Sequence, residues 1–329
     1  MPANLPPEYH EIEKELRTAK TPREKIDIYE RLIAVIPHHK GTDKLIAMYR
    51  QKIAKAKEEL EWRPAATRHA QIFMVEKQGA GQIVLVGPPN SGKSLLVKRL
   101  TGASPEVGDY PFTTKKPAPY MMPFENVMVQ LVDTPPVSQD FMESWFPELV
   151  KMADAVALVI DLSDTNAAGT ATGIIERLRQ KRIELVRGGA EIPPDRFNVL
   201  KRSLAIANKF DGPDAGHRLE DLKSLPGLPG EIVAVSAANG QGLAELRRTL
   251  FELLYVVRVY SKIPGKKPDL NSPFTLPRGS TVMDMARVVH KDFAEKLAYA
   301  RVWNSNGLDG LRVTRGYLIS DCDIVELHI

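Results

Sequence analysis

The sequence has only one cysteine, no long apolar run and little excess charge. The single cysteine, Cys322, excludes an internal disulfide framework and is typical of a reducing compartment. No run reaches the ~20 apolar residues that a membrane helix requires, and the N-terminal stretch contains no apolar core of signal-peptide length. We therefore expect a cytoplasmic protein that does not cross a membrane.

The charge and the composition leave the class of partner open. The formal net charge is +4, from 45 basic and 41 acidic residues, which is too mild to establish a nucleic-acid partner and does not exclude one. Apolar residues make up 43% and charged residues 26%, which are ordinary values for a folded protein. The length of 329 residues suits two or three domains, each with its own core.

Changes of pattern divide the chain into a helical N-terminal region (1–70), a larger α/β domain (71–262), a linker (263–272) and a small C-terminal domain (273–329). In the α/β domain we predict strands at "QIVLVG", "VMVQLVDT", "DAVALVIDLS", "RSLAIANK" and "EIVAVSA". These runs are too continuously apolar to have a wet face, which indicates a mostly parallel sheet with helices on both faces. Ligands of such sheets bind at the carboxyl ends of the strands.

The N-terminal region predicts helices with basic faces. Thr21 is placed as an N-cap and Pro22 as the first helical residue, and Pro37 ends that helix. A later helix has apolar residues along one face, and its other faces carry basic residues, namely Lys44, Arg50, Lys52, Lys55 and Lys57. Two interpretations of this basic run stay open, a solvated helix face and a contact with a phosphate backbone.

The stretch "VGPPNSGKS" follows the first predicted strand of the α/β domain. Gly87 and Gly92 enclose four residues and lead into Lys93 and Ser94, which is the pattern of a phosphate-binding loop. Backbone N–H groups of such a loop point at phosphate oxygens, the lysine reaches the terminal phosphates, and the serine hydroxyl can hold Mg²⁺. ATP kinases, ATPases, motors and GTP switches all use it. The predicted nucleotide contacts in this loop are Gly87, Asn90, Ser91, Gly92, Lys93, Ser94 and Leu95.

Two further stretches suit a phosphoryl-transfer site. "DYPFTT" supplies the hydroxyls of Thr113 and Thr114, although by itself it is typical of an ordinary turn. Asp133 ends a buried strand at the distance from Lys93 that a second metal-side carboxylate requires. The loop, the Ser94 hydroxyl and Asp133 therefore form three parts of one site.

The stretch "ANKFDG" selects the base. The carboxylate of Asp211 only accepts hydrogen bonds, so it can take the ring N–H and the exocyclic amine of guanine, whereas adenine presents a lone pair and no amine at that edge. Asn208 and Lys209 would brace the loops around the base. "VSAANG" ends the next strand, and its Ser236, Ala237 and Ala238 can close the base pocket. We therefore predict that the loop holds GTP and GDP, since an ATP-using kinase would leave Asp211 without a role.

With these motifs in place, residues 80–262 resemble a translation-factor-type GTPase of the Obg and DRG (developmentally regulated GTP-binding protein) branch, "YPFTT" being its first switch. "LPPEYHEIEKELRTAKTPREKI" is similar to the helical N-terminal region of DRG-like proteins. "PFTLPRGSTVMDMARVVHKDF" resembles the start of a TGS domain, a small β-grasp module. The pattern here predicts a helix capped by Thr281 with Asp284, whose apolar face extends to Phe293, and a last strand at "DIVELHI" preceded by a turn with Asp321 and Asp323.

The resemblance implies a role for each matched residue. Lys93, Thr114 and Asp133 would be the catalytic residues, and Ser94, Thr114 and Asp133 would hold Mg²⁺. Asn90 stands where some GTPases of this class coordinate a K⁺ ion that bridges the phosphates, and a loop asparagine selected for its turn geometry is the equal alternative. The family acts with ribosomes and RNA, and a TGS domain usually serves docking. We expect a ribosome or RNA–protein partner and no DNA.

Two features depart from the family. DRG proteins proper carry an additional small insert in the GTPase (G) domain, for which there is no room between Asp133 and Asn208. The second switch normally begins Asp-x-x-Gly, and here Pro136 replaces the glycine, whose N–H reaches the γ-phosphate in related GTPases. Val137 stands where many small GTPases keep a catalytic glutamine. Two hypotheses follow, a slow GTPase switch that docks on a partner and a guanine-nucleotide-binding scaffold that hardly hydrolyses GTP.

Overall fold

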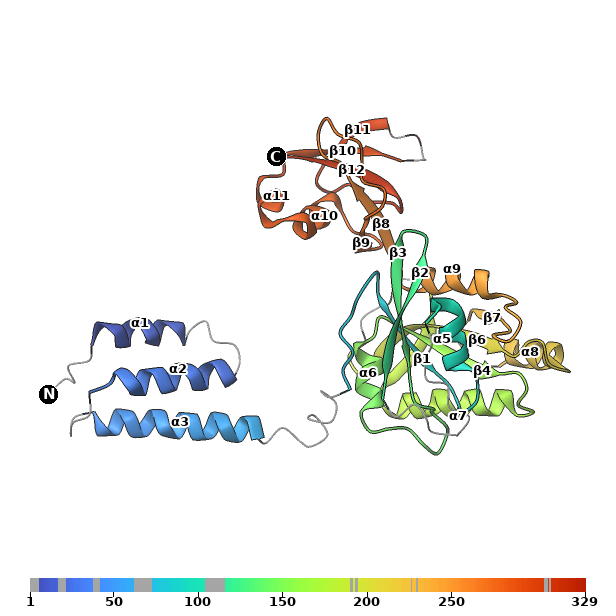
Figure 1. Cartoon of the computed structure of the whole chain (residues 1–329), viewed down its shortest axis with the longest axis horizontal. Helices are drawn as coiled ribbons and strands as arrows, with labels where there is room; N and C mark the ends of the chain where they lie inside the picture. The colour runs from blue at the N-terminus through green and yellow to red at the C-terminus, as the bar shows by residue number, and fades with distance from the viewer. Residues whose placement is uncertain are drawn as a thin grey trace. The chain divides into compact units, whose positions relative to one another are not determined.

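The structure, a computed structural model, describes residues 6–16, 22–37, 42–61, 73–103, 116–189, 192, 195–225, 227–228, 230–304, 307 and 309–329 (Figure 1). It forms two compact units, Met1–Ile72 and Phe73–Ile329. Thr21, Thr113 and Thr114 lie outside the described residues. Within the part that is described, no helix is long and apolar enough to cross a membrane.

The described residues of the first unit form the helices α1 (Pro7–Glu15), α2 (Pro22–Val35) and α3 (Asp43–Glu61). Helix α2 begins at Pro22 and ends before Pro37, as its sequence predicts. Apolar faces of the helices form one small core, which is made by Tyr9, Ile28, Leu32, Ile36, Ile46 and Tyr49. From the predicted basic run, Lys52 lies over the rings of Tyr29 and Tyr49, with its ammonium 5.7 and 5.6 Å from their centroids.

The larger unit contains the expected α/β sheet. Its strand order is β2-β3-β1-β4-β6-β5, with β7 also paired to β6, and β2 alone is antiparallel to its neighbour. The strands are β1 (Gln82–Val86), β2 (Ala118–Phe124), β3 (Val127–Asp133), β4 (Ala155–Asp161), β5 (Ile183–Arg187), β6 (Val199–Asn208) and β7 (Ile232–Ala234). The five predicted strands are present as β1, β3, β4, β6 and β7. The sequence did not predict β2, which contains Pro119 and Pro123, or β5, whose short apolar run is interrupted by Glu184.

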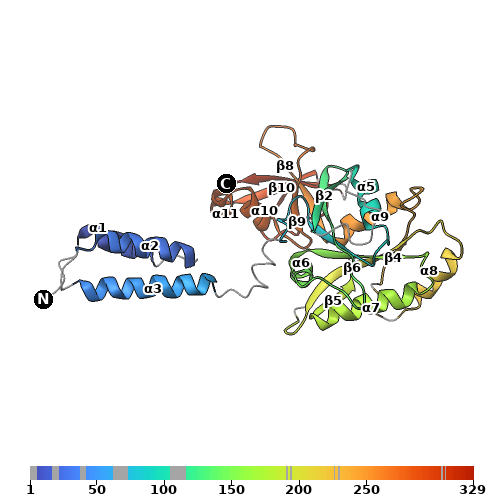
Figure 2. The same cartoon turned by 60° about the horizontal axis from the view of Figure 1, so that its bottom comes forward.

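Helices cover both faces of this sheet (Figures 1 and 2). They are α5 (Lys93–Thr101), α6 (Phe146–Met152), α7 (Ala167–Gln180), α8 (Ala215–Lys223) and α9 (Leu243–Leu253). One core cluster joins strands β1, β3, β4 and β6 to α5 and α9 and contains Ile83, Leu96, Leu131, Ile206 and Leu250. Because burial of such side chains stabilises each by about 1.5–3 kcal/mol, this cluster fixes the strand ends that carry the motifs.

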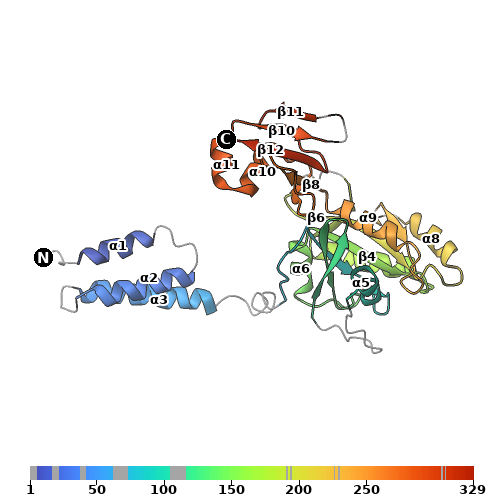
Figure 3. The ribbon, with the colours of Figure 1, turned by 45° about the horizontal axis from the view of Figure 1, so that its top comes forward.

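The second sheet has the order β11-β10-β12-β8-β9. Figure 3 labels the first four of these strands, and β9 is labelled in Figure 1. Its strands are β8 (Val256–Ser261), β9 (Phe274–Pro277), β10 (Tyr299–Trp303), β11 (Asp309–Val313) and β12 (Asp323–His328), and its helices are α10 (Val282–Val289) and α11 (Lys291–Lys296). The sequence pattern places the β8 segment in the α/β domain (71–262). Instead β8 pairs with β9 and β12, because Val257 and Val259 pack into the core of the second sheet.

The helix predicted from Thr281 to Phe293 is two helices. The capping box of Thr281 and Asp284 is present at the start of α10. The chain becomes extended at His290 (φ −171°), whose side chain accepts a hydrogen bond from the N–H of Asp292 and so caps α11. Phe293 therefore packs on the same core from a separate helix. Asp323, predicted in the preceding turn, is instead the first residue of β12 and is fully buried.

The β2–β3 hairpin contacts β8. The guanidinium of Arg258 forms ion pairs with Asp321, at 2.6 Å, and with Glu125 in the hairpin turn. The amide of Asn126, also in the turn, donates a hydrogen bond to the hydroxyl of Tyr260. Asp321 and Glu125 raise the pKa of Arg258, chiefly through the hydrogen bonds to Asp321, so this buried guanidinium stays charged.

Candidate nucleotide-binding site

The phosphate loop connects β1 to α5. Gly87 is required there, because a Cβ atom at this position would lie 2.5 Å from the carbonyl oxygen of Val159. Gly92 has φ +88° at the start of α5, where a side chain would be strained and would also meet the amide nitrogen of Asn208 at 2.3 Å. Asn90 also has a positive φ, 59°, a conformation that asparagine tolerates better than most residues.

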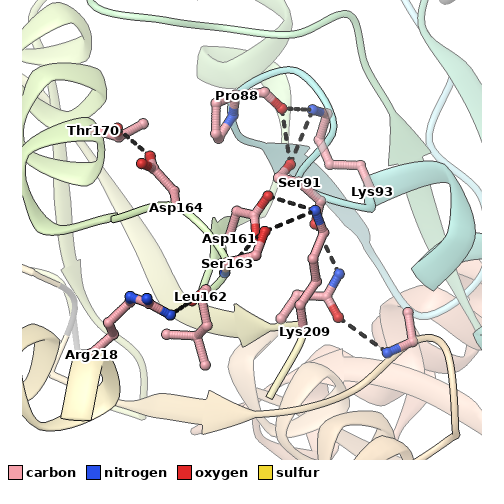
Figure 4. A network of polar contacts seen from close by, with 12 residues as sticks. Pro88, Ser91, Lys93, Asp161, Leu162, Ser163, Asp164, Thr170, Lys209 and Arg218 are labelled. Carbon is pink, nitrogen blue, oxygen red and sulfur yellow. Dashed lines mark hydrogen bonds and ion pairs between the residues drawn. The ribbon is translucent and has the colours of Figure 1, made fainter. Parts of the chain in front are cut away.

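Lys93 lies against its own loop. Its ammonium donates hydrogen bonds to the carbonyl oxygens of Gly87 (2.9 Å) and Pro88 (2.8 Å), the latter drawn in Figure 4. Lys93 is 7% exposed, and burial lowers the pKa of its ammonium to about 8, although the carboxylate of Asp133 opposes this shift. A buried cation of this kind is stabilised by a phosphate placed beside it.

Ser94 and Asp133 are in direct contact. The Ser94 hydroxyl donates a hydrogen bond to Oδ2 of Asp133 at 2.6 Å, while the buried Oδ1 makes no hydrogen bond. Burial raises the pKa of Asp133, and the Ser94 hydrogen bond and the Lys93 charge oppose that shift. A buried carboxylate oxygen without a partner, next to a hydroxyl, is a donor set that suits Mg²⁺.

The part of the chain that the structure describes contains no metal site made by protein side chains alone. Among the described residues no group of three or more His, Cys, Asp or Glu side chains could hold a metal ion. This does not conflict with the donor set of Ser94 and Asp133, because Mg²⁺ at a nucleotide is bound by one or two protein oxygens together with phosphates. The third predicted ligand, Thr114, lies outside the described residues, as does Thr113.

Asn208 joins the phosphate loop to the base loop. Its amide nitrogen donates to the carbonyl oxygen of Ser91 at 2.8 Å, and its side-chain oxygen accepts the N–H of Ala237 at 3.1 Å. The residue is 1% exposed, so both bonds are shielded from water. One side chain thus fixes the distance between the place predicted for the phosphates and the place predicted for the base.

The other base-loop residues surround this bridge. Lys209 has φ 63° and its ammonium lies 2.6 Å from Oδ2 of Asp161 (Figure 4). Asp211 is exposed, as a carboxylate that reads a ligand must be before the ligand binds. The buried Ser236 hydroxyl accepts the N–H of Asn239 at 3.2 Å and so shapes the turn that contains Ala237 and the exposed Ala238.

Sequence reasoning missed two supporting residues. Arg99, in the last turn of α5, donates to the carbonyl oxygens of Ala237 (3.0 Å) and Ala238 (2.6 Å), and so ties the base loop to the helix that follows the phosphate loop. No sequence signal marks it, because an arginine in a helical last turn is common. Asp161 pairs with Lys209 and also accepts the Ser163 hydroxyl at 2.6 Å. Its place at the carboxyl end of β4 is a signal that could have indicated it.

The segment after Asp133 is held against the phosphate loop. The N–H of Val137 donates to the carbonyl oxygen of Gly87 at 3.0 Å, and Val137 is fully buried. The Thr134 hydroxyl donates to the carbonyl oxygen of Leu85 at 2.6 Å. Pro136, between them, has no N–H. The first backbone N–H after the two prolines is therefore already used within the protein.

Comparison with known proteins agrees with this geometry. Residues 82–188 match the family model described as 50S ribosome-binding GTPase, and residues 257–329 match the TGS domain, which includes nearly all of β8. An uncharacterized GTP-binding protein of Methanocaldococcus jannaschii is 26% identical, and the match covers 93% of this chain and 92% of that protein.

Eukaryotic relatives have similar coverage. Developmentally-regulated G-protein 1 of Arabidopsis thaliana is 26% identical over 86% of this chain and 85% of its own length. The human developmentally-regulated GTP-binding protein 2 is 22% identical, and the match covers 86% of this chain and 92% of that protein. The alignment with the archaeal protein extends over 363 residues, more than the 329 of this chain, so that protein contains residues without a counterpart here.

Proposed function

We propose that this chain, a GTP-binding protein of the DRG type with a TGS domain, is a slow GTPase switch whose GTP-bound form docks on the ribosome or on another RNA–protein partner. The observation that carries the proposal is the bridge made by Asn208 between Ser91 and Ala237. It couples binding of the phosphates to recognition of the base, as a switch that responds to GTP and GDP requires. The description of the matched GTPase family as ribosome-binding supports the choice of partner.

Each predicted residue has a place in this function. Backbone groups of residues 87–95 would cradle the phosphates, and Lys93 would exchange its loop carbonyls for phosphate oxygens. Ser94 and Asp133 would hold Mg²⁺, with Thr114 completing the shell. When bound, Mg²⁺ supplies positive charge that stabilises the charge on the phosphates. Asp211 would read guanine inside a pocket closed by the Ser236–Ala238 turn.

Slow hydrolysis follows from the residues after Asp133. Pro136 has no N–H to give to a γ-phosphate, and the N–H of Val137 is bound to Gly87. Val137 also cannot orient a water molecule as a glutamine does. The active state would therefore need a further group, either from the partner or from a K⁺ ion near Asn90. The same observation favours a second candidate function, a guanine-nucleotide-binding scaffold with little or no hydrolysis.

Single-turnover hydrolysis of GTP distinguishes these two functions. The full chain is loaded with GTP and Mg²⁺, and hydrolysis is measured in K⁺ and in Na⁺, with and without ribosomes. A switch gives slow hydrolysis alone and faster hydrolysis with ribosomes. A rate that is higher in K⁺ than in Na⁺ and falls in Asn90→Ala assigns the ion to Asn90. If neither ribosomes nor K⁺ raises the rate above that of a Lys93→Ala variant, the scaffold function replaces the switch.

A further inference from the structure

A cleft lies at the amino ends of the strands of the α/β sheet, opposite to the edge that carries the candidate nucleotide site. Its volume is about 790 Å³, within the range of ligand-binding pockets. Gly81 and Asp154, which directly precede β1 and β4, contribute to it from the amino ends of the strands. Thr275 and Arg278, in and just after β9, contribute from the second sheet. The cleft therefore combines residues of the G domain and of the TGS domain.

Positive charge dominates the lining of this cleft. Lys77, Arg202 and Arg278 line it, and Asp154 is the only carboxylate among the described lining residues. Both oxygens of Asp154 are engaged, one by the ammonium of Lys77 and the other by the N–H of Gln82 at 2.8 Å. The described lining therefore carries three basic side chains and one carboxylate, and this net positive charge attracts an anionic ligand.

The surroundings of the cleft reinforce this charge. Lys201, the neighbour of Arg202 on β6, donates to the carbonyl oxygen of Ala153. Burial and the nearby charge of Lys77 together lower the pKa of the Lys201 ammonium to about 8, although the carboxylate of Asp154 opposes this shift. Cations so close together repel one another, and bound phosphate groups would relieve that repulsion.

Both arginines lie over the ring of Tyr255, which also lines the cleft. The guanidinium carbon of Arg202 lies 4.6 Å from the ring centroid, and that of Arg278 lies 5.2 Å from it. Both are within cation–π distance of one ring. Tyr255 has φ 56°, a strained conformation for an aromatic residue, and it is held there because its N–H donates to Glu252 and its carbonyl oxygen accepts the N–H of Arg278.

We propose that this cleft binds a segment of single-stranded RNA, with backbone phosphates at Arg202 and Arg278 and a base stacked against a guanidinium plane that Tyr255 supports from below. Guanidinium groups bind phosphate in two-pronged geometry, and single-stranded RNA bases stack on aromatic rings and on arginine. The assignment of RNA as the source of the phosphate rests on the proposed function. The site is separate from the nucleotide site and joins the two domains.

Fluorescence anisotropy tests this assignment with a labelled single-stranded RNA of about 12 nucleotides, enough to span a site of this kind. The full chain is used with GDP bound, between about 50 and 200 mM KCl, because each phosphate contact adds to the salt dependence. Arg278→Ala should weaken binding about 3- to 10-fold and reduce the slope of log K against log[salt] by roughly 1. Arg278→Lys keeps the charge, so it should keep the slope and lose only part of the affinity.

Matched controls separate binding from folding. Arg248→Ala removes an exposed arginine of α9 outside the cleft and should leave RNA affinity unchanged. Arg202→Gln should weaken RNA binding as Arg278→Ala does, with GDP affinity and the melting temperature kept as a check of the fold. Absence of RNA binding by the natural chain, or equal RNA affinity and salt slope in all these variants, would overturn the proposal.

A small phosphate ligand is the alternative outcome. If calorimetry shows that inorganic phosphate or GMP binds in an Arg278-dependent manner while RNA affinity does not depend on Arg278, the ligand is not RNA and the proposal fails. Ribosome-stimulated GTP hydrolysis, measured on the same variants, keeps the two proposals apart. If ribosomes stimulate hydrolysis but RNA affinity does not depend on Arg278, only the proposal for the cleft is wrong. If RNA affinity depends on Arg278 but ribosomes do not stimulate hydrolysis, only the proposal of a GTPase switch is wrong.

Discussion

Restoring a backbone donor at Pro136 should change the balance between GTP and GDP. Proline has no N–H, and the next N–H, that of Val137, is committed to the carbonyl oxygen of Gly87 at 3.0 Å. The protein as it stands should therefore bind GDP more tightly than GTP, since only GTP has a γ-phosphate that lacks this contact. Both Pro136→Gly and Pro136→Ala create the missing N–H at a half-buried position.

The size of the change follows from the charge of the acceptor. A hydrogen bond to a charged group is worth about 1.5–3 kcal/mol, which corresponds to a factor of roughly 10 to 150 in the ratio of GTP affinity to GDP affinity. GDP affinity itself should be almost unchanged, because the β-phosphate does not reach this N–H. Loss of the proline ring should lower the free energy of unfolding by up to about 1 kcal/mol, since proline restricts the unfolded chain.

Calorimetry with GDP and with a non-hydrolysable GTP analogue measures this ratio. Comparing the two variants separates the effect of the restored N–H from the effect of a more flexible backbone, because alanine restores the N–H without the mobility of glycine. Pro135→Ala is the matched control, since it changes the neighbouring buried proline and should leave the ratio as it is. A ratio that moves in neither Pro136 variant would mean that another group already contacts the γ-phosphate, and the explanation of slow switching given above would be wrong.

Three other predictions concern the base, the lysine and the domain boundary. Asp211→Asn should weaken GDP binding by at least ~2 kcal/mol and improve binding of xanthosine diphosphate, and calorimetry showing unchanged GDP affinity would refute the base assignment. Burial lowers the pKa of Lys93 to about 8, and a bound phosphate should raise it. GDP binding should therefore take up protons, and GDP affinity should fall as the pH rises through about 8. Calorimetry in buffers of different ionisation enthalpy measures this proton uptake. Deleting residues 256–329 should abolish ribosome association and leave GDP affinity unchanged. Deleting only residues 273–329 should also lower the melting temperature, because β8 then remains without its partner strands β9 and β12.

The positions of the candidate site residues in the fold could largely be derived from the sequence, because the motifs are short stretches at strand ends. The phosphate loop is one continuous stretch whose glycines are required by a close contact at Gly87 and by a positive φ at Gly92. Asn208 follows a fully apolar half-strand, so its place at the carboxyl end of β6 could be derived from the pattern alone. The bond from Asn208 to Ser91 could not, because it joins residues 117 positions apart.

The boundary between the two domains was not predictable from local pattern. Only two residues, Leu254 and Tyr255, separate the end of α9 from the start of β8. The short connection therefore predicts that β8 belongs to the G domain. Its pairing with β9 and β12 depends on residues that come later in the sequence. Alternation along β8 predicts only that Val257 and Val259 share one face and that Arg258 lies on the other.

The alternation of residues along β8 does not predict whether the face that carries Arg258 is buried. A charged residue between two buried valines predicts a solvent-exposed face, yet Arg258 is only 6% exposed, because Glu125 and Asp321 come to it from positions 133 and 63 residues away. Removing one partner would leave a buried charge without compensation, which is far more costly than loss of a surface pair. Strand β3 extends from this contact to the nucleotide site, with the hairpin turn before Val127 and Asp133 at its far end. The strand that supplies a predicted Mg²⁺ ligand therefore belongs to the same hairpin that touches the TGS domain, so the two domains share a structural element as well as an interface.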